Sequence, residues 1–262
     1  MQKSRFSIGI KGLLTGLIVV FGVALMSFLI PQKHITVYLA GDSTMANKEI
    51  KAYPETGWGM PFVAFFDSTV TVDNRAKNGR STKTFLTEGL WQSITNNLHQ
   101  GDYVLIQFGH NDEVPTKVSY INPEGYMANL IRFVKETRGK GGYPVLITPV
   151  ARRKFNAAGV IEDTHTEYAA LVRKVAAEQK VPLIDLDKES QALLQKLGSE
   201  DSKLLYNHLL PGENLNYPDG KIDDTHFSEL GARKMAEIVL ADIRNLKLEL
   251  ANRIVVSNLK IK

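Results

Sequence analysis

Cysteine is absent from the 262-residue chain. Its absence excludes disulfide bonds, thiolate metal sites, a cysteine nucleophile and a lipid anchor on cysteine. The chain also has no large excess of positive or negative charge. Its formal net charge is only +4, and three basic residues near the N-terminus supply most of it. The rest of the chain is near +1. This balance argues against a nucleic-acid-binding protein, which needs a concentrated basic face.

Internal repeats, low-complexity runs and linkers are lacking from residues 31–262. Hydrophobic residues make up 44% of the chain and charged residues 23%, which are ordinary proportions for a globular protein. About 230 residues are enough for one large domain with a sizeable core. We therefore expect residues 31–262 to form a single domain.

The first 30 residues have the pattern of an export signal. Lys3, Arg5 and Lys11 precede an uncharged run from Leu13 to Ile30, and residues 1–30 contain no acidic side chain. The run of about 18 residues is also long enough for an uncleaved signal anchor, and no clear small-residue cleavage site follows it. We expect a signal peptide, or a membrane anchor through residues 13–30, and export of the body to the periplasm or the extracellular space.

Five apolar segments alternate with helical patterns along the body. The expected strands cover residues 35–40, 70–74, 103–108, 144–148 and 181–185, and the expected helices cover residues 60–66, 123–138, 162–179, 187–197 and 228–245. This alternation predicts an α/β fold in which a parallel five-stranded sheet is covered by helices on both faces and joined by right-handed crossovers. Residues 253–257 are a candidate additional edge strand.

Polar turns follow the first three expected strands. Ser43 follows the first, Asn78 and Gly79 follow the second, and residues 109–112 (Gly-His-Asn-Asp) follow the third. Because parallel strands end at the same edge of a sheet, we expect these turns to converge. Residues 223–226 (Asp-Asp-Thr-His) precede the last expected helix and complete a set of candidate catalytic groups.

A serine, a histidine and an aspartate are a candidate nucleophile, base and orienting acid. Ser43 is a poor nucleophile at neutral pH unless a base accepts its proton. Imidazoles in general titrate near neutrality, so His226 is the candidate base. An aspartate three positions before the histidine lies about one helical turn away. That spacing favours Asp223 over Asp224 as the residue that orients His226, although the sequence alone permits either.

Acyl transfer passes through an oxyanion, which needs preorganised hydrogen-bond donors. Gly79 can present its backbone N–H at close approach, Asn111 can present its side-chain amide, and the N–H of Ser43 is a third candidate. Simpler interpretations are that Gly79 and Asn111 are ordinary turn residues and that one of the two aspartates caps the last helix. An Asp-x-x-His pair can also hold a metal ion, but no third ligand stands at a convincing spacing, so we expect no metal.

Together these residues resemble a known superfamily. Gly41-Asp42-Ser43, Gly79, Gly109-His110-Asn111-Asp112 and Asp223-x-x-His226 match the four blocks of the SGNH (GDSL-type) hydrolases, and the resemblance spans residues 35–245. Six segments resemble the rhamnogalacturonan acetylesterases of carbohydrate esterase family 12, namely residues 41–45, 53–59, 74–81, 109–112, 148–152 and 224–227.

The resemblance implies a flavodoxin-like three-layer α/β/α sandwich and a serine esterase that removes O-acetyl groups from pectic rhamnogalacturonan through an acetyl-enzyme. It implies Ser43 as nucleophile, His226 as base, Asp223 as orienting acid, and an oxyanion hole that includes Gly79 and Asn111. No metal and no cofactor are implied.

Two alternatives are an SGNH esterase or lipase acting on other acyl esters, acetylxylan included, and a glycan-binding domain without catalysis. A lipase needs a long apolar groove, whereas the loops after the strands are rich in Asn, Asp, Tyr and Gly, which favours a hydrated substrate. Loss of Ser43 or His226 would indicate a binding domain, and neither is lost.

Three residues are candidate contacts for an acetylated polysaccharide or oligosaccharide. Trp58 can stack on a sugar face, although core packing is an equal alternative. Arg152 follows the fourth expected strand and can attract galacturonate carboxylates, unless it belongs to a solvated basic run. Tyr217 lies in the loop of residues 209–221, which we expect to form part of the cleft wall. We expect a monomer.

Overall fold

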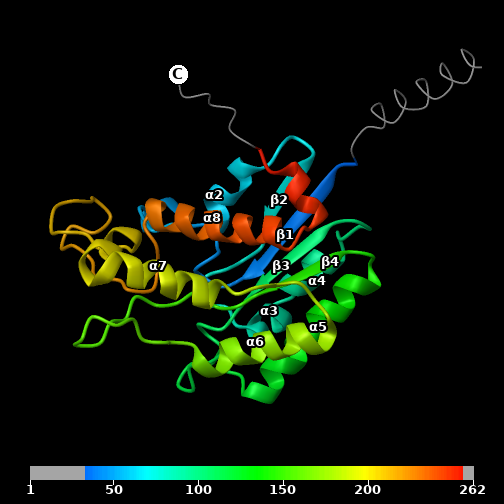
Figure 1. Ribbon diagram of the computed structural model, residues 1–262, viewed down its shortest axis with the longest axis horizontal. Coiled ribbons are helices and arrows are strands. Elements are labelled where there is room, and N and C mark those ends of the chain that lie inside the picture. The colour runs from blue at the N-terminus through cyan, green and yellow to red at the C-terminus, as the bar shows by residue number, and fades with distance from the viewer. Residues whose placement is uncertain (1–32, 256–262) are drawn as a thin grey trace, which may run out of the picture. The chain divides into compact units, whose positions relative to one another are not determined.

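A computed structural model describes residues 33–255 of the chain (Figure 1). The predicted export signal at residues 1–30 lies outside the described residues and stays a prediction. None of the helices between residues 33 and 255 is long and apolar enough to cross a membrane.

A five-stranded parallel sheet lies at the centre of the described structure, with the strand order β2-β1-β3-β4-β5 (Figure 1). Its strands are β1 (Ile35–Gly41), β2 (Val70–Asn74), β3 (Tyr103–Gln107), β4 (Tyr143–Ile147) and β5 (Leu183–Ile184). All neighbouring pairs are parallel. The predicted α/β fold is therefore confirmed.

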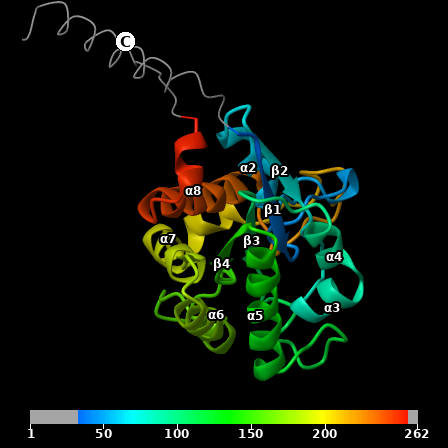
Figure 2. The same ribbon diagram turned by 90° about the vertical axis from the view of Figure 1, so that its right-hand side faces the viewer.

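Helices cover both faces of the sheet (Figure 2). One face carries α2 (Gly59–Phe62), α7 (Leu186–Asp201) and α8 (Glu229–Asn245), and the other carries α3 (Thr82–Thr87), α4 (Leu90–Thr95), α5 (Pro123–Gly139) and α6 (Thr166–Gln179). Short 3-10 helices span Ile50–Ala52, Val63–Phe65, Ser202–Leu205 and Glu249–Arg253.

Alternation along β1 builds the two cores. Val37 and Leu39 pack into the cluster beneath α2, α7 and α8, whereas Tyr38 and Ala40 pack into the cluster beneath α3 to α6. Successive side chains of a strand point to opposite faces, so a strand covered on both sides is apolar throughout. This explains why β1 and β3 are nearly continuous apolar runs.

The strand register sets the edge at which the polar turns meet. Gly41 of β1 pairs with Gln107 of β3, and Gln107 pairs with Ile147 of β4. The residues that follow these three positions therefore leave the sheet side by side. Ligands of open α/β sheets bind at this carboxyl edge.

The start of α8 determines where His226 lies. The Ser228 side chain accepts a hydrogen bond from the Gly231 N–H at 3.2 Å and caps the helix. A Cβ at Gly231 would collide with the Leu205 carbonyl, so only glycine allows the helix to approach that segment so closely. The adjoining Asn207 N–H donates to the His226 carbonyl at 2.9 Å. The segment that carries His226 is thus fixed by the cap of α8 on one side and by the bond from Asn207 on the other.

Several predicted elements differ from the structure in their bounds, and two of the differences have a clear physical reason. The predicted strand at residues 253–257 is wrong over its described part, because Arg253 ends a 3-10 helix and Ile254 makes only an isolated antiparallel bridge with Phe66. Ile254 is apolar because it packs into the core cluster, not because it extends the sheet. The helix predicted from residue 162 begins at Thr166, after a loop in which the Glu162 N–H donates to the Lys154 carbonyl at 2.8 Å.

Candidate active site

Ser43 lies in a tight turn directly after β1. The carboxylate of Asp42 accepts hydrogen bonds from the backbone N–H of Thr44 at 3.0 Å and from its hydroxyl at 2.8 Å. The Asp42 carbonyl also accepts from the Ala46 N–H at 3.1 Å. Such aspartate side-chain bonds to the following backbone stabilise a turn. They hold Ser43, which is 7% exposed, at the carboxyl edge of the sheet.

A buried hydrogen-bonded chain supports this turn from behind. The Trp58 indole donates to Gln107 Oε1 at 2.6 Å, and Gln107 Nε2 donates to the Thr44 hydroxyl at 2.7 Å. Trp58 is 0% exposed and packs edge-on against Phe62. The prediction that Trp58 stacks on a sugar is therefore wrong, because no face of the indole reaches solvent. A signal for its role was Gln107, a polar residue in an otherwise apolar strand.

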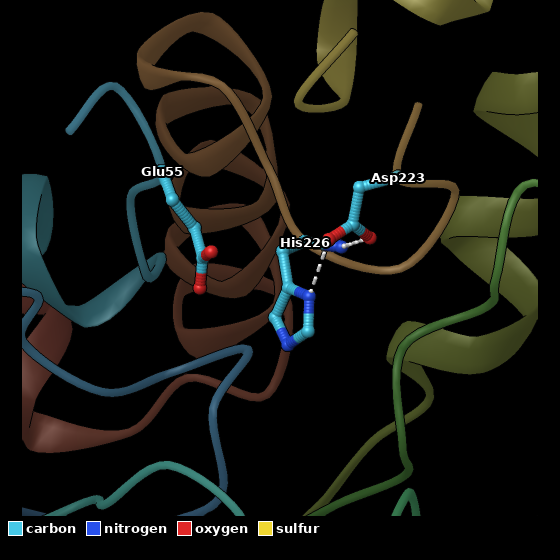
Figure 3. Close-up of side chains that lie close together, drawn as sticks. All are labelled: Glu55, Asp223 and His226. Atoms are coloured by element: carbon cyan, nitrogen blue, oxygen red, sulfur yellow. Dashed lines mark hydrogen bonds and ion pairs between the residues drawn. The ribbon is translucent and has the colours of Figure 1, made fainter. Parts of the chain in front are cut away.

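The three predicted triad side chains form one hydrogen-bonded chain. His226 Nε2 lies 2.9 Å from Ser43 Oγ, and His226 Nδ1 lies 2.9 Å from Asp223 Oδ2. The other oxygen of Asp223 accepts from the backbone N–H groups of His226 and Thr225, both at 2.9 Å. Figure 3 shows Asp223 reaching both the ring and the backbone of His226. One carboxylate therefore fixes the imidazole and the turn that carries it.

Asp224 points elsewhere. Its Oδ1 lies 2.7 Å from Arg153 Nη1 and 2.8 Å from His208 Nε2. Within residues 33–255, the ring of His226 is therefore bonded by Asp223 and not by Asp224. This agrees with the spacing argument that favoured Asp223.

Hydrogen bonding keeps Asp223 ionised. Burial alone raises the pKa of Asp223, but the hydrogen bonds from His226 and Thr225 outweigh it and hold the pKa well below its usual range. Lys221 Nζ, 3.4 Å from Asp223 Oδ2, adds a positive charge beside the same carboxylate. An ionised carboxylate at Nδ1 stabilises an imidazolium when Nε2 accepts a proton.

A polar pocket of about 420 Å³ opens above Ser43. It brings together every residue predicted for the triad and the oxyanion hole. Its lining consists of Ser43, Glu55, Asn78, Gly79, His110, Asn111, Lys117, Arg152, Asp223, Thr225 and His226.

Gly79 and Asn111 both line the pocket, and a different feature fixes each of them. Gly79 has a φ of +76°, and a Cβ there would meet nothing within 4 Å, so the left-handed backbone rather than crowding requires glycine. Asn111 Nδ2 donates to the Arg80 carbonyl at 3.0 Å, and its Oδ1 accepts from Lys117 Nζ at 3.1 Å. These two bonds fix the orientation of the amide and leave its second N–H for a ligand.

Arg152 and Tyr217 occupy different places. Arg152 lines the pocket, where its guanidinium donates to the Thr225 hydroxyl at 2.9 Å and to the His110 carbonyl at 3.3 Å. Tyr217 is not among the residues that line this pocket; its hydroxyl donates to the Ala52 carbonyl at 3.0 Å, and its ring lies beside Lys221. A direct substrate contact of Tyr217 stays a prediction.

A buried polar layer lies under the pocket. Asp112 accepts from the N–H and the hydroxyl of Thr82 at 2.8 and 2.7 Å, while its other oxygen has no partner among the described residues. Burial raises the pKa of Asp112 to about 7, and the neighbouring charge of Asp42 adds to the shift. Burial also lowers the pKa of His110 well below its usual value, so its ring is neutral at neutral pH.

Glu55 was missed by sequence reasoning, although it lies beside the triad (Figure 3). Ligand atoms of Glu55, Asp223 and His226 lie within 4.8 Å of one another, which is a spacing that a metal ion can use. Here the ammonium groups of Lys48 and Lys221 already lie 2.7 and 3.2 Å from the Glu55 carboxylate. We therefore interpret the cluster as an ion-pair network and assign it no metal.

This geometry agrees with the comparison to known proteins. Residues 39–234 match the GDSL-like Lipase/Acylhydrolase family, and the chain belongs to this family of carboxylic ester hydrolases. It is 42% identical over 224 residues to rhamnogalacturonan acetylesterase RhgT of Bacillus subtilis (strain 168), covering 86% of this chain and 96% of RhgT. It is 35% identical over 225 residues to the probable rhamnogalacturonan acetylesterase YesY of the same organism, covering 84% and 97% of the two chains.

Solved structures share the fold. YxiM of Bacillus subtilis superposes with a TM-score of 0.72 at 26% identity, over 84% of this chain and 58% of that chain. The acetylxylan esterase Axe2 of Geobacillus stearothermophilus gives a TM-score of 0.60 at 18% identity, over 80% and 94% of the two chains. The second likeness concerns the fold alone.

The two adjacent aspartates give a matched test of the triad geometry. Asp223→Asn should lower kcat for p-nitrophenyl acetate by about 10³-fold or more, because the ring of His226 loses its ionised partner. Asp224→Asn should stay within about fivefold of the parent, since the Asp224 carboxylate bonds Arg153 and His208 rather than the ring of His226. An equal or larger loss in Asp224→Asn would contradict the assignment.

Asp112→Asn tests the buried carboxyl. A raised pKa stabilises the folded state below the unfolded pKa of about 3.9, and this stability is lost as the pH rises toward 7. Between pH 4 and pH 7.5 the parent's free energy of unfolding should therefore fall relative to that of Asp112→Asn, by a few kcal/mol. Urea denaturation at several pH values measures this difference. Parallel pH profiles for the two proteins would show that folding does not raise the pKa of Asp112.

Proposed function

We propose that this protein is a serine esterase that removes O-acetyl groups from pectic rhamnogalacturonan. The observation that carries the proposal is the hydrogen-bonded chain from Asp223 through His226 to Ser43, at 2.9 Å for each link, within a polar pocket. The 42% identity to a rhamnogalacturonan acetylesterase over most of both chains supports the choice of substrate.

In the first half-reaction, the Ser43 hydroxyl attacks the acetyl carbonyl carbon while His226 Nε2 accepts its proton. Asp223 holds Nδ1 and stabilises the positive ring that forms. The carbonyl oxygen becomes an oxyanion that accepts hydrogen bonds from the backbone N–H groups of Ser43 and Gly79 and from the Asn111 amide. When the tetrahedral intermediate collapses, the sugar oxygen leaves and takes the proton from His226, and Ser43 retains the acetyl group.

In the second half-reaction, water enters the place that the sugar hydroxyl has left. His226 Nε2 accepts a proton from the water as the oxygen attacks the acetyl carbon. The same donors stabilise the second oxyanion. Collapse releases acetate, and the proton on His226 returns to Ser43 Oγ. Neither step requires a metal, because neutral N–H donors stabilise the oxyanion by hydrogen bonds and the imidazolium of His226 supplies the positive charge beside it.

Two positively charged side chains of the pocket support an acidic polysaccharide. Arg152 and Lys117 both line it, and Lys117 is solvent-exposed. The guanidinium and the ammonium can bind a galacturonate carboxylate beside the acetylated hydroxyl. The numerous polar side chains of the lining favour a hydrated sugar over a long acyl chain.

Ser43→Ala tests the proposed chemistry. The purified parent should release acetate from acetylated rhamnogalacturonan, and the variant should lose about 10³-fold or more of that activity without loss of thermal stability. Acetylated xylan and a long-chain p-nitrophenyl ester are assayed in parallel. A preference for the long-chain ester would assign a lipase-like function, and acetate release by Ser43→Ala at the parental rate would exclude Ser43 as nucleophile.

Arg152→Gln and Lys117→Gln test the acidic substrate. A hydrogen bond to a charged group contributes about 1.5 kcal/mol or more, so each variant should raise KM for acetylated rhamnogalacturonan roughly tenfold. KM for the uncharged p-nitrophenyl acetate should change little. Arg132→Gln, on α5 in an ion pair with Glu136, removes a distant positive charge as the control. Equal KM increases for both substrates would contradict carboxylate recognition.

A further inference from the structure

Lys48 is a buried lysine whose ammonium group has three close acceptors. Its Nζ donates to the Ser43 backbone carbonyl at 2.6 Å and to Asn78 Oδ1 at 2.9 Å, and lies 2.7 Å from Glu55 Oε1. The side chain is only 2% exposed. An ammonium has three N–H donors, so each donor has a partner here.

The three acceptors belong to three different segments of the pocket. Ser43 lies in the turn after β1, Asn78 lies in the turn after β2, and Glu55 lies in the loop before α2. All three residues line the pocket, whereas Lys48 is not part of that lining. Lys48 therefore connects the segments from behind and acts on the pocket only through its neighbours.

Charge balance keeps this group in place. Burial lowers the pKa of Lys48, and the bond with Glu55 opposes that effect. Burial raises the pKa of Glu55, but the Lys48 ammonium outweighs it and leaves the pKa of Glu55 below its usual value. A buried charge is tolerated when it is paired and hydrogen-bonded. Lys221 lies between Glu55 and Asp223, at 3.2 and 3.4 Å, and extends the network to the triad.

The turn that carries Gly79 has little packing of its own. Asn78 and Gly79 are both exposed, and a Cβ on Gly79 would meet nothing within 4 Å. The Lys77 N–H donates to the Gly41 carbonyl at 3.1 Å and anchors the side of the turn nearest the sheet. On the far side of the turn, Asn111 Nδ2 donates to the Arg80 carbonyl at 3.0 Å, and the bond from Lys48 to Asn78 ties the turn to the carbonyl of Ser43.

We propose that Lys48 is a positioning residue that fixes the distance between the nucleophile turn at Ser43 and the oxyanion turn at Asn78–Gly79, with Glu55 as its counter-ion. The inference rests on the proposed esterase function. Two N–H groups from different strand exits bind one oxyanion only if their separation is fixed, because small displacements of catalytic donors cost large factors in rate. Lys48 bonds both turns at their outer ends and adds this constraint to the bond between Lys77 and Gly41.

Lys48→Met and Asn78→Ala test the proposal with p-nitrophenyl acetate as substrate. Each variant should lower kcat roughly tenfold to hundredfold, with KM within about threefold of the parent, because the donors lose their alignment but the pocket stays open. The double variant should lose no more than Lys48→Met alone, since both changes break the same link. Lys51→Met is the matched control; that lysine is 83% exposed and pairs with Glu49, so kcat should not change.

Loss of stability is separated from loss of alignment by two measurements. Titration of active sites by the p-nitrophenol burst gives kcat per folded site. Lys48→Met/Glu55→Gln removes both buried charges, so it should recover thermal stability relative to Lys48→Met while kcat stays low. Asn78→Ala alters an exposed side chain and leaves folding intact, so it tests the link even if both Lys48 variants unfold.

The outcomes distinguish this proposal from the proposed function. A parent protein that hydrolyses no ester overturns the function itself. An active parent with an unchanged kcat in Asn78→Ala overturns the positioning role alone. The positioning role is also overturned if Lys48→Met keeps the parental kcat per folded site. Multiplicative losses of kcat in the double variant would overturn it as well.

Discussion

The hydrogen bond between Ser43 and His226 is the contact on which the rest of the site depends. It joins residues 183 positions apart at 2.9 Å, so the fold must bring two distant segments into contact at one point. On one side, the parallel register ends β1 beside β3 and places the Ser43 turn at the carboxyl edge of the sheet. On the other side, the capped start of α8 and its close approach at Gly231 fix the segment that carries His226. Moving either element would separate the base from the nucleophile.

Electrostatics add a second constraint along the pocket. Charges alternate from Asp223 to Lys221, to Glu55 and to Lys48, with neighbouring groups 2.7 to 3.4 Å apart. Each buried charge in this chain is compensated by its neighbour, which keeps both carboxylates ionised next to the catalytic imidazole. The network connects loops that the sheet alone would leave independent. The strand order brings the loops to one edge of the sheet, and the ion pairs then fix the positions of the loops relative to one another.

Much of the fold and of the candidate site could be predicted because the relevant signals are local. Apolar periodicity indicated the strands, turn residues marked their exits, and the spacing of three between Asp223 and His226 selected the aspartate that contacts the ring. Burial and ion pairing between loops are tertiary properties, and sequence reasoning failed on them. Trp58 follows a loop pattern typical of a cleft rim, yet its indole is fully buried against Phe62. Sequence reasoning assigned no role to Lys48, Glu55 or Lys117, and only the fold places them in or behind the pocket.

The most direct test of this account is to identify the residue that becomes covalently modified. The purified, active protein is treated with diethyl p-nitrophenyl phosphate, which phosphorylates activated serines, and its peptides are then mapped by mass spectrometry. If Ser43 is the nucleophile, each chain takes up one label, on the peptide that contains Ser43. A His226→Ala variant should take up little label, because the base that activates the serine is gone. Inhibition with the label on another residue, or full activity after Ser43 is labelled, would contradict this account.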